Sequence, residues 1–353
     1  MSAPVRVLHL MGALRPSGME RMLVSAADAF AGQEVVGIVV GQGVGHPFAE
    51  ELEAAGYAVR IIPAVRTPAG ASALVRMLRR ERPDVVHVHT EGFFLPTVLL
   101  CLIGMRTRRI VHTVHNVFSG TRGWRLRRRI QQALADRLLS EVVAPSPDVQ
   151  DNERGFGRRT TLVYNWVDRR FLDLAGLRAL RPRSVGEQRL LLVGNCNDAK
   201  NHELALRAVL RQGGAVLHVG DESGASGEES RLLARLAADG RLLRRGVQPP
   251  DDAILEADAY LMPSRNEGMG VALAEAISAG LPSLVADAPG LRWADGQPGV
   301  RVLALDDSAW EAALQQIGKG TAEEVRASEP VDFSPERGAR EYAAAYRRAL
   351  ARR

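Results

Sequence analysis

The sequence predicts an α/β protein made of two Rossmann-like domains, each with a doubly wound parallel sheet, that face each other across a cleft. Three observations lead to this prediction. Short apolar runs alternate with helix-like stretches along the chain, which is typical of parallel strands joined by helices. The alternation stops once, over residues 173–188, and then starts again. The length of 353 residues fits about two domains.

The first domain is expected to span residues 1–172. Its apolar runs are short and end in polar or glycine-containing loops, and apolar residues recur at helical spacing between them. We therefore expect strands at residues 5–11, 35–40, 58–62, 85–89, 109–115, 142–145 and 161–164, and helices at residues 20–30, 47–56, 71–80, 93–104 and 123–139.

Residues 173–188 are expected to form a linker, because they contain Pro182, Gly186 and several arginines without a clear period. The second domain is expected at residues 189–332, with strands at 189–193, 215–219, 242–247, 259–262 and 283–286 and helices at 203–211, 230–239, 251–257 and 308–316. Ser334 can cap a last helix within residues 333–353, which we expect to pack back towards the N-terminal domain.

Positive charge is concentrated in the first half of the chain. Residues 1–175 hold 23 arginines and 16 acidic residues, whereas the remainder is slightly acidic. A basic half could favour an anionic acceptor, and the basic amphipathic helix at 123–139 could touch anionic lipid. A solvated basic surface and a helix that packs one apolar stripe are the simpler interpretations.

Several classes of protein are disfavoured. The two cysteines, Cys101 and Cys196, make no disulfide framework and fit a reducing cytoplasm. The longest apolar run has 13 residues, and a membrane span needs about 20. The chain opens directly on a predicted strand, so we expect no signal peptide. We expect a cytoplasmic protein, with peripheral contact at the inner face of the membrane as an option.

The stretch from Ser264 to Pro282 has the strongest functional signal. An apolar run ends before it, a loop with Gly268 and Gly270 follows, and then a short helix that Gly280 ends. Backbone N–H groups and the positive end of a helix suit an anion such as a pyrophosphate. Glu267 and Glu275 could accept hydrogen bonds from hydroxyl groups on either side of that anion. An anion between two sets of hydroxyls describes a nucleotide sugar.

The first half offers weaker candidates at the carboxyl ends of its predicted strands, where open α/β sheets bind ligands. Gly18 stands just before a predicted helix, and His115 ends a predicted strand. His87 and His89 lie on one face of another strand. Because the sequence shows no third ligand near this His-x-His pair, we expect no metal site.

In this context the chain resembles the family 4 glycosyltransferases of the two-domain GT-B fold, of the type found in bacterial polysaccharide or secondary-metabolite biosynthesis. The resemblance covers nearly the whole chain and is strongest in the Glu–seven residues–Glu signature at Glu267 and Glu275. Other matches follow in the order of the family, and they are the loop at Gly18, residues 84–89, 113–116, Ser146, residues 164–168, Val193-Gly194 with Lys200, Gly220-Asp221 and Gly246-Val247.

The resemblance implies a retaining transfer of a hexose-type sugar from a nucleoside-diphosphate donor, most simply a UDP-sugar, without a metal or other cofactor. Glu275 would bind the ribose, Val247 would lie against the base, and Glu267 would contact the transferred sugar. Lys200 and the N–H groups of Gly268, Met269, Gly270 and Gly18 would bind the pyrophosphate. His115 would lie beside the sugar near the acceptor. The implied catalytic residues are His115, Lys200 and Glu267.

The acceptor would be a saccharide, a lipid-linked molecule or a small molecule, held by loops of the first domain at residues 12–18, 91–96 and 116–125. Asn195 stands where many family members have an arginine, so the donor site lacks one cation. Two alternatives stay open: a non-catalytic partner that binds a sugar nucleotide, and a sugar-nucleotide epimerase of the same fold. Nothing in the sequence indicates a nucleic-acid partner.

Overall fold

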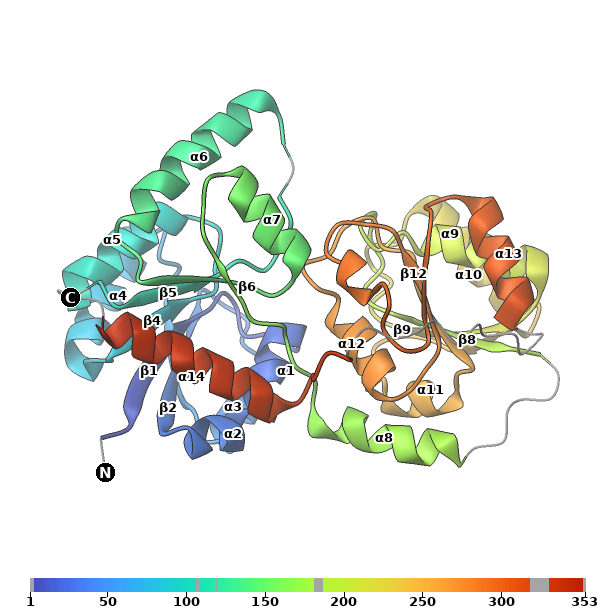
Figure 1. The fold of residues 1–353 in the computed structure, drawn as a ribbon, viewed down its shortest axis with the longest axis horizontal. Helices are drawn as coiled ribbons and strands as arrows, with labels where there is room; N and C mark the ends of the chain where they lie inside the picture. The colour runs from blue at the N-terminus through green and yellow to red at the C-terminus, as the bar shows by residue number, and fades with distance from the viewer. Residues whose placement is uncertain (1–2, 106–107, 119, 181–186, 318–329, 352–353) are drawn as a thin grey trace. The chain divides into compact units, whose positions relative to one another are not determined.

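The computed structural model describes residues 3–105, 108–118, 120–180, 187–317 and 330–351 (Figure 1). It divides into two compact units. The first unit contains Met1–Asp168 together with Ser334–Arg353, and the second contains Arg169–Phe333. Both units are built on one parallel sheet with helices on its faces. The predicted fold class, two Rossmann-like parallel-sheet domains, is confirmed.

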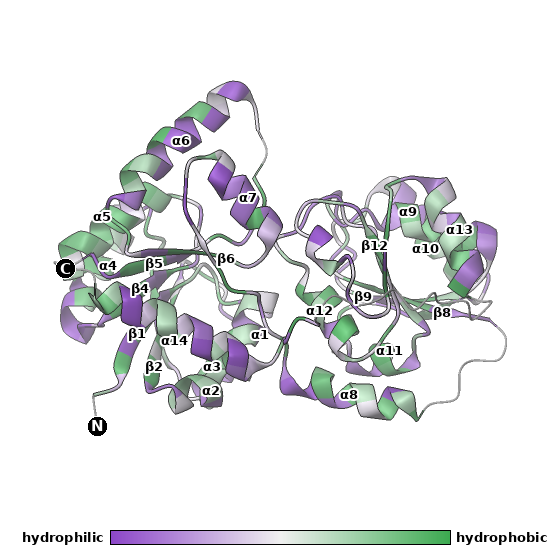
Figure 2. Ribbon diagram, viewed as in Figure 1, coloured by the Kyte–Doolittle hydropathy of each residue, from purple (hydrophilic) through white to green (hydrophobic). Residues whose placement is uncertain are grey.

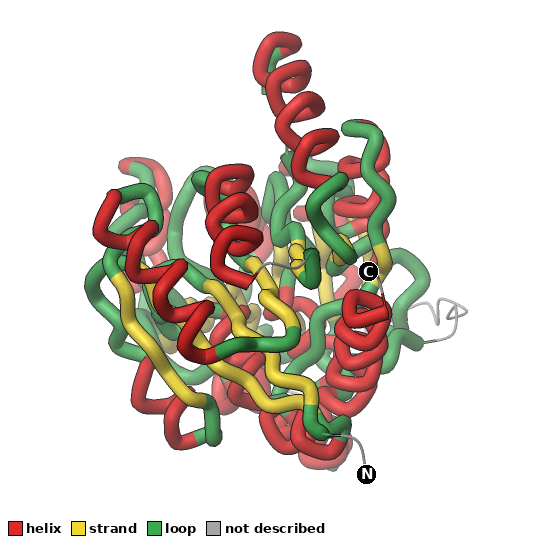
Figure 3. The backbone as a smooth tube through the Cα atoms, turned by 90° about the vertical axis from the view of Figure 1, so that its left-hand side faces the viewer, coloured by secondary structure: helices red, strands yellow, loops and turns green. Residues whose placement is uncertain are grey.

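The sheet of the first unit has seven parallel strands in the order β3-β2-β1-β4-β5-β6-β7. They are β1 (Val5–Leu10), β2 (Val35–Gln42), β3 (Ala58–Ile62), β4 (Val85–Val88), β5 (Ile110–Thr113), β6 (Glu141–Ala144) and β7 (Thr161–Leu162). Figure 3 shows these strands side by side with helices around them. The order reverses between β1 and β4, and crevices for ligands form at such a point.

The helices of the first unit cover both faces of this sheet. They are α1 (Gly18–Ser25), α2 (Ala27–Gly32), α3 (Ala49–Ala54), α4 (Pro68–Glu81), α5 (Phe94–Met105), α6 (Arg122–Asp136), α7 (Pro147–Gly155) and α14 (Pro335–Ala351). Leu8 and Val86 point to the face under α4 and α5, where the main apolar core lies. His9 and His87 point to the opposite face, against Tyr346 of α14.

The last helix, α14, belongs to the first unit although it follows the second in sequence. It lies across the strands next to α2 (Figure 1). The Ser334 side chain accepts a hydrogen bond from the Arg337 backbone N–H at 3.2 Å, as expected for a cap. Tyr342 and Tyr346 are fully buried against the sheet. The apolar stripe of α14 therefore completes the core of this unit.

The sheet of the second unit has six parallel strands in the order β10-β9-β8-β11-β12-β13. They are β8 (Arg189–Val193), β9 (Ala215–Val219), β10 (Leu242–Arg244), β11 (Ala259–Met262), β12 (Ser283–Ala286) and β13 (Val300–Leu303). Its helices are α8 (Arg169–Ala179), α9 (His202–Gln212), α10 (Gly227–Ala238), α11 (Asp251–Glu256), α12 (Val271–Ser278) and α13 (Asp307–Ile317), with a short 3-10 helix at Arg292–Ala294. Here the strand order reverses between β8 and β11.

The linker prediction is wrong over its first residues. The region 173–179 continues α8, which packs on α11 and α12 of the second unit through buried Phe171 and Leu174. The arginines and Gly176 of this segment obscured the pattern of an amphipathic helix in the sequence. Residues 181–186 of the predicted linker lie outside the described part of the chain. The second unit therefore begins at Arg169, before the predicted boundary at residue 189.

Candidate donor and acceptor sites

The two loops with the strongest predicted residues meet where the strand order of the second unit reverses. Residues 194–201 follow the central strand β8, and residues 263–270 follow its neighbour β11. The Arg265 N–H donates to the Ala199 carbonyl at 2.8 Å, and the Asn201 side chain donates to the Pro263 carbonyl at 3.0 Å. These bonds hold the two loops together at the edge where α/β sheets bind ligands.

Lys200 and Glu267 face each other across these loops. The Lys200 ammonium lies 2.7 Å from Oε1 of Glu267, and both side chains are only partly exposed. The Lys200 backbone N–H donates to the Asn197 side chain at 3.1 Å, and the Glu267 N–H donates to the Pro289 carbonyl at 3.0 Å. A cation and a carboxylate, each on a fixed backbone, are thus brought together.

Glycines behind both loops allow this close arrangement. A Cβ atom at Gly220 would lie 2.0 Å from the carbonyl oxygen of Gly194, at the start of the Lys200 loop. A Cβ atom at Gly290 would lie 2.0 Å from the carbonyl oxygen of Glu267. Both distances are far shorter than a van der Waals contact, so any side chain at Gly220 or Gly290 would displace one of the two loops.

The helix α12 begins at this point with Gly270 as its N-cap residue. The Met269 side chain is buried, and its carbonyl accepts a hydrogen bond from Trp293 Nε1 at 2.8 Å. The side chain of Met269 is thus part of the core, so a contact of this residue with a donor would come from its backbone. The positive end of α12 adds to the charge of Lys200.

Glu275 lies on α12 and is half-buried. Burial first, and then the nearby carboxylates of Glu267 and Glu275, raise the pKa of Tyr260 well above its ordinary value. Tyr260 belongs to β11 and is fully buried. Both carboxylates of the Glu–seven residues–Glu signature therefore lie close enough to Tyr260 to interact with it electrostatically.

Asn195 and Val247 lie in loops after β8 and β10. The Asn195 side-chain oxygen accepts a hydrogen bond from the Asp221 N–H at 2.9 Å, which ties this loop to the loop after β9. Val247 is three-quarters exposed, so its side chain is available to an apolar surface such as a base. Arg265, which the sequence analysis did not select, stands in the Glu267 loop half-exposed, 3.7 Å from Asp198.

Gly18 is the first residue of α1 in the first unit, after the N-cap Ser17. The Glu20 carboxylate accepts hydrogen bonds from the Ser17 hydroxyl and from the Arg15 N–H. A buried acidic side chain therefore already stands at this helix N-terminus. This contact reduces the positive potential that was expected to make Gly18 a phosphate contact.

His115 follows β5, is half-buried and stands at the end of a chain of imidazoles whose other members are buried. Its Nε2 lies 3.3 Å from Nδ1 of His89, whose Nε2 lies 3.1 Å from Nδ1 of His9. Burial lowers the pKa of His115 to about 4, so the ring is neutral near pH 7.

The expectation that the His87-x-His89 pair has no further ligand nearby is wrong. His9 pairs with His87 in the register of β1 and β4, which brings a third imidazole to the same face. His87 however uses both nitrogens, with the Tyr346 hydroxyl at 2.9 Å and the Thr113 hydroxyl at 2.8 Å. These three rings are therefore explained by hydrogen bonding and packing. Sequence alone could not find His9, because the neighbours of a strand depend on sheet order.

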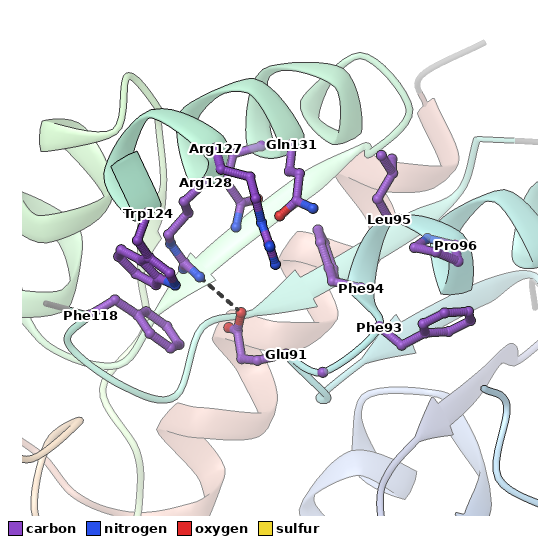
Figure 4. Close-up of a pocket in the computed structure, with 12 residues that line it drawn as sticks. Glu91, Phe93, Phe94, Leu95, Pro96, Phe118, Trp124, Arg127, Arg128 and Gln131 are labelled. Atoms are coloured by element: carbon purple, nitrogen blue, oxygen red, sulfur yellow. Dashed lines mark ion pairs between the residues drawn. The ribbon is translucent and has the colours of Figure 1, made fainter. Parts of the chain in front are cut away.

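A pocket of about 580 Å³ opens in the first unit between α5, α6 and the loops before them (Figure 4). Its lining combines aromatic, cationic and amide side chains, namely Glu91, Phe93, Phe94, Leu95, Pro96, Phe118, Trp124, Arg127, Arg128, Gln131 and Gln132, with Gly92. Two of the three predicted acceptor loops, 91–96 and 116–125, contribute to it, and the loop 12–18 does not. The α6 residues Arg127, Arg128 and Gln131 were not selected individually from the sequence.

Glu91 stands at the base of this pocket. It lies 3.3 Å from His112 Nε2 and 3.7 Å from Arg128, whose guanidinium stacks 3.7 Å from the centre of the Phe118 ring. Burial alone would raise the pKa of Glu91, but His112, Arg128 and Arg158 together lower it. Both carboxylate oxygens are buried without a hydrogen bond. Beyond these ion-pair contacts with His112 and Arg128, an ionised carboxylate can still accept hydrogen bonds from hydroxyl groups of a ligand.

No helix in the described ranges is long and apolar enough to cross a membrane.

Comparison with known proteins identifies the family of both units. Residues 16–171 match the family model "Glycosyltransferase Family 4", and residues 187–319 match "Glycosyl transferases group 1". A D-inositol 3-phosphate glycosyltransferase of Geodermatophilus obscurus is 32% identical over 206 residues, which is 52% of this chain and 46% of that protein. The chain thus spans about half the length of the curated relatives it matches.

Solved structures match over nearly the whole chain. A glycosyltransferase from Rickettsia africae ESF-5 superimposes with a TM-score of 0.74 at 13% identity, over 99% of this chain and 97% of that one. Anabaena Alr3699/HepE, solved in complex with UDP-glucose, gives 0.72 at 18% identity over 98% of each chain. Each of the two units matches one of the two family models, and the chain belongs to the family 4 glycosyltransferases of the GT-B fold.

Proposed function

We propose that the chain is a retaining glycosyltransferase that moves a hexose-type sugar from a nucleoside-diphosphate donor, most simply a UDP-sugar, to a hydroxyl group of an acceptor. The observation on which this rests most is the 2.7 Å pair of Lys200 and Glu267 at the reversal of strand order, beside the start of α12. The similarity to Anabaena Alr3699/HepE, which binds UDP-glucose, supports the choice of donor.

In the proposed reaction the bond between the anomeric carbon and the phosphate oxygen breaks. Negative charge grows on the leaving phosphate, and the Lys200 ammonium and the N–H groups at the start of α12 are preorganised donors for it. The acceptor oxygen bonds to the anomeric carbon on the same face, and its proton passes to the phosphate oxygen. Glu267 would orient the sugar, and Glu275 would hold the ribose. No metal ion takes part in this step.

The pairing of Lys200 with Glu267 fits this role. Without a donor, each charge is neutralised by the other, so neither is left uncompensated in a partly buried site. An arriving pyrophosphate would share the ammonium with Glu267, while the sugar hydroxyls would donate to the carboxylate. His115 is proposed to contact the sugar and Gly18 the phosphate.

The acceptor is proposed to occupy the pocket of Figure 4. Trp124 and Phe118 offer flat faces for a sugar or other ring, and Glu91 offers acceptors for hydroxyl groups. Arg127 and Arg128 would attract a negatively charged substituent. These features suit a saccharide, a lipid-linked molecule or a small molecule that combines hydroxyl groups with an anionic group.

Peripheral binding to an anionic membrane is proposed for α6, at the cytoplasmic face. Leu126, Ile130 and Leu134 recur every fourth residue and are 61%, 54% and 47% exposed. Figure 2 shows this helix with alternating hydrophobic and hydrophilic residues, the pattern of helices that lie in a membrane interface. Ile103 of the neighbouring α5 is also exposed. A lipid-linked acceptor would then reach the pocket from the membrane surface.

The test is a panel of UDP-, GDP- and ADP-hexoses, read by thermal shift and by release of the nucleotide. We expect one donor to raise the melting temperature and to be hydrolysed slowly. Addition of Mg²⁺ or Mn²⁺, or brief exposure to EDTA, should leave the rate unchanged. If no sugar nucleotide binds, the proposed donor site is wrong; a strict requirement for added Mg²⁺ or Mn²⁺ would refute the metal-independent step.

One observation favours a second function, a non-catalytic sugar-nucleotide-binding partner. Asn195 replaces a cation and its side-chain oxygen is occupied by the Asp221 N–H. The same panel separates the two functions, because such a partner would bind a donor without releasing nucleotide in the presence of any acceptor.

A further inference from the structure

A second cluster of reactive side chains lies beneath the Lys200 loop, outside the residues assigned to the donor. Cys196 comes from the loop after β8, His202 is the first residue of α9, His218 lies in β9, and Glu229 stands in the first turn of α10. All four side chains are buried, with residue exposures of 2% or less. Four separate elements thus direct a thiol, two imidazoles and a carboxylate into the interior.

The atoms that could bind a metal converge on one point. Cys196 Sγ lies 3.5 Å from His218 Nε2 and 3.9 Å from His202 Nδ1, and His202 Nδ1 lies 2.9 Å from Glu229 Oε1. The sulfur and the two imidazole groups each offer a ligand atom within 4.8 Å of the others. A zinc ion with bonds of about 2.0–2.3 Å places its tetrahedral ligands about 3.3–3.7 Å apart. The ligand atoms of Cys196, His202 and His218 therefore need only small shifts to enclose such an ion, and the Glu229 carboxylate, which contacts His202, would complete the set after a larger shift.

A second feature, independent of these distances, points the same way. While His218 Nε2 faces the cluster, Nδ1 lies 3.4 Å from Oε1 of Glu222. Glu222 is fixed by Arg245 through three hydrogen bonds of 2.8, 2.9 and 2.6 Å. Metal-binding histidines commonly direct their other nitrogen to a carboxylate, which orients the ring and makes it a stronger ligand.

We propose that Cys196, His202, His218 and Glu229 bind a structural Zn²⁺ ion. One thiolate and one carboxylate balance the charge of the ion, and the mixture of sulfur and imidazole ligands favours zinc over magnesium or calcium. Binding would release the proton of the Cys196 thiol, because the thiolate is the ligand. With four protein ligands the coordination is complete, so this ion has no open position for a substrate.

The three-histidine cluster of the first unit differs in a decisive way. There His87 engages hydroxyl groups with both nitrogens, and all members are imidazoles without a negative ligand. In the cluster of Cys196, the sulfur contacts both imidazoles and two acidic side chains lie beside them. The charge of a divalent cation is compensated only in the second case.

The proposed ion would fix the loop that contains Lys200. Cys196 stands four residues before Lys200, and its N–H donates to the Asp221 carbonyl at 2.8 Å. The ion would link this loop to β9, α9 and α10. This effect on the loop would matter to sugar transfer, but metal binding itself does not depend on the proposed function.

The test is the metal content of the full-length chain, purified without a histidine tag from zinc-supplemented medium. We expect about one zinc ion per chain, measured by inductively coupled plasma mass spectrometry. After removal of zinc, Co²⁺ should give the intense visible bands of a tetrahedral site and a thiolate-to-cobalt charge-transfer band. Cys196→Ser should lose the charge-transfer band and most of the metal. Cys101→Ser, which changes the buried thiol of the other unit, should keep both.

Glu222→Gln is a second variant, which tests the proposal if Cys196→Ser fails to fold. It leaves all four ligands in place, and we expect metal affinity about 10–100-fold weaker, since second-layer partners contribute that much. Zinc retained equally by the Cys196→Ser and Cys101→Ser variants would overturn the proposal. So would a chain without zinc whose melting temperature and cobalt spectrum do not respond to added metal.

Discussion

The proposed donor site depends on the contact between Lys200 and Glu267. The Lys200 ammonium lies 2.7 Å from Oε1 of Glu267, at the carboxyl ends of adjacent strands. Both residues were selected from the sequence: Lys200 is one of only two lysines in an arginine-rich chain and matches the family pattern, and Glu267 stands in a glycine-containing loop. They come into contact because β8 and β11 are neighbours in the sheet, and this strand order cannot be deduced from the sequence. For the same reason, the sequence could not show that Arg265 lies in this site, that His9 lies beside His87, or that Cys196 lies beside His202, His218 and Glu229.

Lys200→Ala tests the pair. We expect kcat to fall about 100–1000-fold, the usual cost of removing one preorganised donor to a developing negative charge. The measurement is turnover with the donor found in the sugar-nucleotide panel, alongside circular dichroism to verify the fold. Arg211→Ala is the matched control, since it removes an exposed cation of the same unit that pairs with Glu311. Equal rates for Lys200→Ala and the unchanged protein would contradict the donor-site assignment.

At the scale of helices and strands, long periodic segments were predicted well and weak or short ones were not. The predicted strand at 215–219 agrees with β9, whereas β13 (Val300–Leu303) was missed because the exposed Arg301 interrupts its apolar run. α7 was missed although Ser146 caps it and Pro147 begins it, since it has few apolar residues. The predicted helix 20–30 is two helices that meet at Ala26. Local propensity is outweighed by packing at such places.

The helix α6 carries a prediction at this scale. Replacing Leu126 and Ile130 by glutamine should lower binding to anionic vesicles at least tenfold, because burying each such side chain in an apolar phase contributes about 1.5–3 kcal/mol. Stability should change little, since both side chains are exposed. Sedimentation with vesicles containing phosphatidylglycerol measures this, with vesicles of phosphatidylcholine alone as reference.

Leu177→Gln is the control for that experiment, because Leu177 is 56% exposed on α8 of the other unit. It should bind vesicles as the unchanged protein does. If the α6 double variant also binds unchanged, then α6 is an ordinary solvated helix and the simpler interpretation of its sequence holds.

At the scale of the whole molecule, each doubly wound sheet has its candidate site residues after strands at or next to the point where the strand order reverses. The first unit places His89 and His115 after β4 and β5, and the second places Lys200 and Glu267 after β8 and β11. The repeated strand–helix pattern was sufficient to predict this architecture and the edge of each sheet that matters. It was not sufficient to predict that α8 belongs to the second unit, because that depends on contacts with α11 and α12.

The buried histidines of the first unit predict how the stability of the protein depends on pH. Burial lowers the pKa of His9 to about 3 and of His115 to about 4, and lowers those of His87 and His89 well below their ordinary value. The folded state keeps these rings neutral, while the unfolded chain takes up protons near pH 6.5. Stability is thus present above about pH 6.5 and is lost as the pH falls towards 4.

Each such histidine should add about 1.4 kcal/mol per pH unit to the slope of unfolding free energy between those limits. Urea unfolding at a series of pH values between 7 and 4.5, followed by circular dichroism, measures this slope. His9→Gln should reduce it by about one such increment, whatever its effect on stability at pH 7, because a group that titrates only on unfolding has been removed. Arg76→Ala, an exposed change on α4, should leave the slope unchanged. A His9→Gln slope equal to that of the unchanged protein would mean that His9 binds its proton equally in both states, and the neutral imidazole chain to His115 would have to be abandoned.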